Sequence, residues 1–107
     1  MLALKVFDGG RRTTSRRLAS ALRLCLRRRV KIVVLPLGTP RRASASVGRA
    51  LSRLVRSGSV VLVSAGNEGP SFGTVGWPGS RLSSLAVASY DYATNKISRF
   101  SSRGPLA

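Results

Sequence analysis

The residue whose chemistry stands out is Asn67, which follows an apolar run within residues 60–70, Val-Val-Leu-Val-Ser-Ala-Gly-Asn-Glu-Gly-Pro. A side-chain amide donates a hydrogen bond without carrying a charge. Fixed at the mouth of a cleft, it can therefore stabilise negative charge that develops only in a transition state. The purely structural interpretation is an ordinary turn, because Gly66 and Asn67 are both common loop residues. The surrounding sequence has to decide between these two interpretations.

The composition restricts the chemistry that the chain can perform. Its 107 residues include no histidine, so the commonest general base and metal ligand is missing. The single cysteine, Cys25, excludes an internal disulfide, and the 3 acidic residues are spaced too far apart to predict a calcium site. The sequence predicts no cofactor, no metal and no membrane span, and it shows no signal peptide, which leaves the cellular location open.

The elements that would position Asn67 alternate between strands and helices. Strands are predicted at residues 2–7, 31–35, 60–64, 84–89 and 97–101. The first helix is predicted to follow an N-cap among residues 13–15 and to bury Leu18, Leu22, Cys25 and Leu26. The second is predicted to start at Thr39 and Pro40, to bury Val47, Leu51, Leu54 and Val55, and to end at Gly58.

Single helices between strands predict an α/β fold with a parallel sheet and right-handed crossovers. Ligands of such sheets bind beyond the carboxyl ends of the strands. Leu37–Gly38 and Gly66–Asn67 both follow predicted strands. We therefore expect these two loops to converge on one cleft.

Several segments together resemble the subtilisin-like serine proteases, the subtilase family. They are residues 60–70, 73–79 (Gly-Thr-Val-Gly-Trp-Pro-Gly), 85–88 and 98–105 (Ser-Arg-Phe-Ser-Ser-Arg-Gly-Pro), in the order and rough spacing that the family uses. The resemblance implies an incomplete three-layer α/β/α catalytic domain over residues 1–107, with no second domain. It also implies that Asn67 is the oxyanion-hole residue and that Trp77–Pro78 is a cis peptide.

The same resemblance implies which residues line the substrate cleft. Backbone groups of one wall would pair with an extended peptide as an added strand, and Gly76 would form the base of the pocket for the residue before the scissile bond. Simple turn geometry is an alternative explanation of both Gly66 and Gly76. The implied cleft residues are Leu35, Pro36, Leu37 and Gly38 on one wall, Ser64, Ala65 and Gly66 on the other, and Gly76 at the base.

Two departures from the family pattern limit the implied activity. Val34 and Pro36 stand where the family usually has Asn and Ser, and a proline cannot donate a backbone hydrogen bond. The Asp, His and Ser motifs of the catalytic triad are also missing, and Asp8 reads as an ordinary turn aspartate. The family order places the Asp and His motifs before this segment and the Ser motif after it. We therefore expect a central part of an endopeptidase that would act on peptide or protein substrates only when flanking sequence completes it.

Two other functions stay open. The formal net charge of +16, concentrated before Gly58, would attract nucleic acid or another polyanion without specificity. However, no aromatic residues interleave with the arginines, and no nucleic-acid-binding module is recognisable. The third possibility is a non-catalytic relative of the subtilases that keeps the cleft to bind peptides, which fold alone does not separate from a protease.

Overall fold

A parallel three-stranded sheet forms the centre of the computed structural model, which describes residues 1–40 and 44–105. Its strands are β1 (Ile32–Leu35), β2 (Val60–Ser64) and β3 (Leu85–Val87), in the spatial order β1-β2-β3. Leu35 pairs with Val63, and Ser64 pairs with Val87, so the three strands end at the same edge of the sheet. The predicted α/β fold with a parallel sheet is therefore confirmed.

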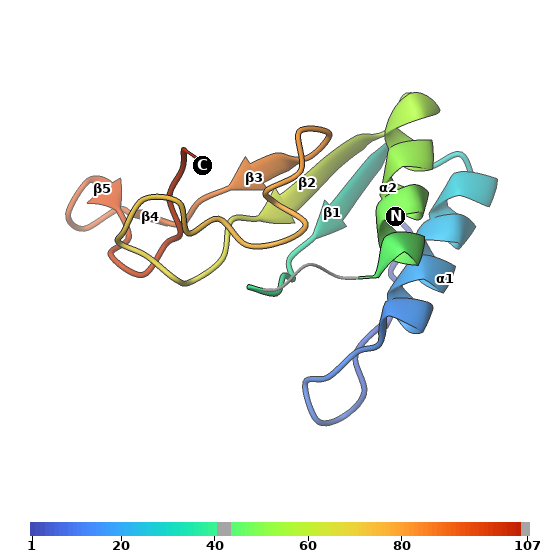
Figure 1. Cartoon of the computed structure of the whole chain (residues 1–107), viewed down its shortest axis with the longest axis horizontal. Helices are drawn as coiled ribbons and strands as arrows, with labels where there is room; N and C mark the ends of the chain where they lie inside the picture. Colours follow the sequence, from blue (N-terminus) through green and yellow to red (C-terminus); the bar gives the residue numbers. More distant parts are fainter. Residues whose placement is uncertain (41–43, 106–107) are drawn as a thin grey trace.

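Two helices, α1 (Ser15–Arg27) and α2 (Ala45–Arg56), lie on the same side of this sheet (Figure 1). Thr14 caps α1 as predicted, because its hydroxyl accepts a hydrogen bond of 3.1 Å from the Arg17 N–H. After α2, Gly58 adopts the positive φ of 92° that suits a glycine just past a helix end. Neither helix is long and apolar enough to cross a membrane, within the part of the chain that the structure describes.

The predicted start of α2 was wrong. Thr39 pairs with Trp77 in an antiparallel bridge instead of capping a helix. The helix begins at Ala45, after Ser44, whose side chain makes no capping hydrogen bond. The pairing of the Thr39 backbone with a distant residue has thus outweighed the helix-start signal of a threonine followed by a proline. Residues 41–43, which belong to the predicted helix, lie outside the described residues.

Three strand predictions also need correction. Residues 2–7 join no sheet; together with β1 and α1 they line an apolar hollow of about 640 Å³, and no described strand pairs with them. The strand at 84–89 is shorter, at Leu85–Val87, and of the predicted strand at 97–101 only Ile97 lies in a strand, while residues 98–101 form a loop. Next to that loop, β4 (Tyr90–Asp91) and β5 (Lys96–Ile97) form a separate antiparallel pair.

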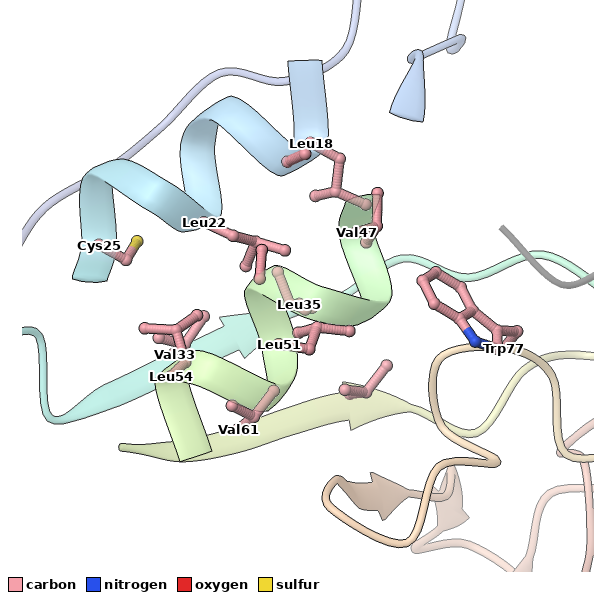
Figure 2. Packing of buried hydrophobic residues seen from close by; sticks show 13 residues of the cluster. Leu18, Leu22, Cys25, Val33, Leu35, Val47, Leu51, Leu54, Val61 and Trp77 are labelled. Carbon is pink, nitrogen blue, oxygen red and sulfur yellow. The ribbon is translucent and has the colours of Figure 1, made fainter. Parts of the chain in front are cut away.

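The core fills the space between the two helices and one face of the sheet (Figure 2). The predicted apolar stripes supply most of it, while Leu26 and Val55 lie partly buried at its margin. Its main members are Leu18, Leu22 and Cys25 from α1, Val47, Leu51 and Leu54 from α2, and Val33, Leu35, Val61 and Val63 from the strands. The side chains that helix periodicity and strand alternation predict to be buried thus meet on one side of the sheet.

The opposite face of the sheet is apolar and exposed. Ile32 and Val34 of β1 keep 62% and 63% of their surface accessible, and Leu85 and Val87 of β3 keep 59% and 55%. Parallel sheets normally have both faces covered. The described residues therefore cover only half of the surface that this kind of sheet buries.

Polar substitutions on this open face should cost little stability. We expect the double variant Val34→Thr with Leu85→Thr to bind less of the dye ANS. Its free energy of unfolding, measured by urea denaturation, should change by less than about 0.5 kcal/mol. Leu51→Ala, in the core, is the control and should lose about 2–5 kcal/mol. Equal destabilisation by both variants would show that the open face is buried in solution.

Candidate functional site

Backbone hydrogen bonds tie together three loops at the carboxyl edge of the sheet. Thr39, in the loop after β1, exchanges two hydrogen bonds of 2.8 Å with Trp77, one in each direction. The Gly76 N–H donates to the Ala65 carbonyl oxygen, beyond β2, at 2.9 Å. The segment around Gly76 and Trp77 thus lies between the two loops that the sequence predicts to converge.

Small residues make this approach possible. A Cβ atom on Gly76 would lie 3.0 Å from the Thr39 carbonyl oxygen, and one on Gly38 would lie 3.2 Å from the Trp77 carbonyl oxygen. Both distances are tight for a carbon–oxygen contact, so a side chain at either position would push the loops apart. The Trp77–Pro78 peptide in this segment is cis, as the resemblance implied.

Asn67 lies at the same edge, on the turn that follows β2. Its side chain is exposed and has no hydrogen-bond partner among the described residues. Gly66, directly before it, has a φ of 110°, a backbone conformation that few residues other than glycine adopt. The Asn67 amide is therefore an unengaged donor on a turn whose backbone is constrained.

Ser102 holds the turn on both sides of Asn67. Its N–H donates to the Gly66 carbonyl oxygen at 3.0 Å, and its hydroxyl accepts from the Glu68 N–H at 3.0 Å. One position further on, the Gly69 N–H donates to the Phe100 carbonyl oxygen at 2.9 Å. Ser102 is only 3% exposed, so water does not compete for these hydrogen bonds.

The role of Ser102 was missed in the sequence analysis, where the residue served only as part of a motif. A pair of serines next to Phe100 gives no periodic signal, and the hydrogen bonds of Ser102 join it to residues more than thirty positions away. The one local sign is two adjacent hydroxyls, Ser101 and Ser102, before the Arg-Gly-Pro turn. Serine hydroxyls commonly satisfy backbone groups of nearby turns.

The predicted wall residues differ in what they expose. The Leu35 side chain is buried in the core, so only its backbone remains for a cleft, whereas Pro36 and Gly38 are exposed and Leu37 is half-buried. Leu35, Pro36 and Leu37 also line the hollow beside residues 2–7. On the other side, Ala65 is buried and its carbonyl oxygen is already occupied by the Gly76 N–H.

The other candidate reactive groups have structural surroundings. Asp8 accepts hydrogen bonds from the Arg12 and Gly10 N–H groups, which lower the pKa of its carboxyl group and fit a turn aspartate. Burial raises the pKa of the Cys25 thiol, which makes it a poorer nucleophile. Within residues 1–40 and 44–105, no three histidine, cysteine or acidic side chains come together as metal ligands.

Comparisons with known proteins agree with this fold. All of residues 1–107 match the family model described as the subtilase family, Peptidase S8. Among solved structures, the chain is similar to sphericase (27% identity, TM-score 0.85), with 95% of this chain and 36% of that one covered. It is also similar to the S41 psychrophilic protease (27% identity, TM-score 0.74), with 90% of this chain and 33% of that one covered.

The prenylagaramide maturation protease PagA shares the fold at 21% identity and a TM-score of 0.79, with 95% of this chain and 40% of that one covered. The chain thus spans between about a third and two fifths of the length of these structures.

Removal of the Ser102 hydroxyl should loosen the turn that carries Asn67. We expect Ser102→Ala to speed amide hydrogen exchange at Glu68 roughly fivefold to tenfold, since a single hydrogen bond contributes about 1 kcal/mol. Ser101→Ala is the matched control, because the Ser101 hydroxyl accepts from the Ser89 N–H instead. An equal effect of both substitutions at Glu68 would contradict a specific role for Ser102.

Proposed function

The chain belongs to the subtilase family, whose model matches all of residues 1–107, and we propose that it is part of a subtilisin-like serine endopeptidase. In this proposal Asn67 donates a hydrogen bond to the oxyanion that forms during peptide-bond hydrolysis by acyl transfer. The backbone of Leu35–Gly38 and the residues around Ala65 and Gly76 form the walls that hold the substrate. The substrates are peptides or proteins that bind in an extended conformation.

The observation that carries the proposal is the unengaged amide of Asn67 on a turn that is fixed from both sides. A donor lowers a reaction barrier only when it is aimed before the charge develops, because reorienting it would consume the energy gained. The two hydrogen bonds of Ser102 supply this rigidity, and the exposure of Asn67 leaves its amide accessible to a substrate.

Residues 1–107 supply the electrostatic part of such a reaction and not its reacting groups. Acyl transfer from a serine needs a base to take the hydroxyl proton, and the chain has no histidine. We propose that the Asp, His and Ser of the triad belong to sequence outside residues 1–107. On the wall formed by the loop after β1, Pro36 offers only its carbonyl oxygen to an extended peptide.

Asn67→Leu tests the oxyanion role in a catalytic domain that holds residues 1–107 together with triad segments. We expect turnover to fall about a hundredfold to a thousandfold with KM nearly unchanged, since the interaction is made mainly in the transition state. This magnitude is that of the oxyanion-hole asparagine of subtilisin itself. Asn95→Gly is the matched control, because Asn95 is the only other asparagine and its φ of 56° suits glycine.

Two outcomes would count against this assignment. A raised KM with unchanged kcat would make Asn67 a residue that binds the ground state of the substrate. Peptide binding without turnover, in a domain whose triad is present and folded, would favour the non-catalytic peptide-binding relative instead.

A further inference from the structure

A basic hollow of about 580 Å³ lies beside α2, away from the Asn67 turn. Arg49, Arg53 and Arg56 line it from one face of the helix, since residues three and four apart are neighbours on a helix surface. Arg81 lines it from the loop that follows Trp77 and Pro78. Four guanidinium groups from two separate elements therefore share one concave surface.

Arg81 is held in this hollow by its backbone and by α2. Its N–H donates to the Pro78 carbonyl oxygen at 3.0 Å, and its Nη2 donates to the Ser52 hydroxyl at 2.9 Å. Gly48 leaves the space for it, because a Cβ atom there would lie 3.2 Å from the Arg81 Nη1. A methyl group at Gly48 would therefore require the end of the Arg81 side chain to shift by a few tenths of an ångström.

The Arg81 Nε atom is buried and has no hydrogen-bond partner among the described residues. A buried donor of a charged group costs free energy when it is left unpaired. Of the described residues that line the hollow, none is acidic. The hollow therefore concentrates positive charge and keeps one donor unsatisfied.

A solvated arginine face would leave no donor unpaired, because exposed arginines pair with water, whereas the Arg81 Nε is buried without a partner among the described residues. Ser44 and Ser52 also line the hollow; the Ser52 hydroxyl already donates to the Gly48 carbonyl oxygen at 3.0 Å, and the Ser44 hydroxyl pairs with that of Ser46. These features together are typical of a site for an anion with several oxygen atoms.

We propose that this hollow binds the phosphate group of a small phosphorylated compound. The Arg81 guanidinium keeps N–H groups besides the one that its Nη2 donates to Ser52, and these can bind phosphate oxygens. Arg49, Arg53 and Arg56 would balance the charge of about −2 that a phosphate group carries, which a single carboxylate would not match. Trp77, next to Gly76, also lines the hollow, but none of the proposed cleft residues does, so the proposal goes beyond the proposed function.

Titration of the full chain with inorganic pyrophosphate at 150 mM salt tests the proposal, because at about this ionic strength charges more than about 8 Å apart are largely screened. We expect saturable binding with one pyrophosphate per chain. Arg81→Gln should weaken it about tenfold or more, and Arg81→Lys should weaken it too because lysine keeps the charge but loses the fork. The control is Arg23→Gln, since the Arg23 Nη2 also donates to a serine hydroxyl, that of Ser20; it should change the affinity less than about twofold.

A second pair of variants keeps the proposal testable if Arg81→Gln fails to fold. Arg49→Gln with Arg53→Gln removes two exposed charges from α2, and Arg23→Gln with Arg27→Gln removes two charges at the same spacing from α1. Only the α2 pair should weaken pyrophosphate binding, by about tenfold or more. Equal losses in the two pairs, or the absence of saturable binding to the wild-type chain, would overturn the proposal.

Discussion

The arrangement of this chain depends on a few backbone hydrogen bonds between loops at the carboxyl edge of its sheet. The reciprocal pair between Thr39 and Trp77, with the bond from Gly76 to Ala65, brings the loops after β1 and β2 to a common segment. Glycine at position 76 permits this approach, since a Cβ atom would collide with the Thr39 carbonyl oxygen. Every residue of the candidate site lies on, or next to, a loop that these bonds hold.

Local signals predicted the elements whose apolar pattern is clear in the sequence. The bounds of β2 match the predicted 60–64, and the buried face of α1 follows from the spacing of Leu18, Leu22 and Cys25. The signals failed where a distant partner decides the structure. Residues 2–7 have strand composition but no paired neighbour, the bridge to Trp77 removes Thr39 from a helix cap, and the hydrogen bonds of Ser102 reach across the chain to Gly66 and Glu68.

The two faces of the sheet bear on the proposal that this chain is part of a protease. One face packs on α1 and α2, while Val34 and Leu85 on the other face stay exposed. This chain spans between about a third and two fifths of the length of the solved structures that it resembles. We infer that further sequence covers the open face and supplies the triad, so that the rigid turn of Asn67 faces reacting groups that these residues do not contain.

A crystal structure of a complete catalytic domain that includes residues 1–107, with a peptide aldehyde bound to its serine as a tetrahedral adduct, tests the central claim most directly. The oxygen of such an adduct stands for the oxyanion of the transition state. We predict that the Asn67 Nδ2 atom lies about 2.7–3.1 Å from that oxygen, with Ser102 still bonded to Gly66 and Glu68. An Asn67 side chain turned away from the adduct, with another donor in its place, would contradict the account.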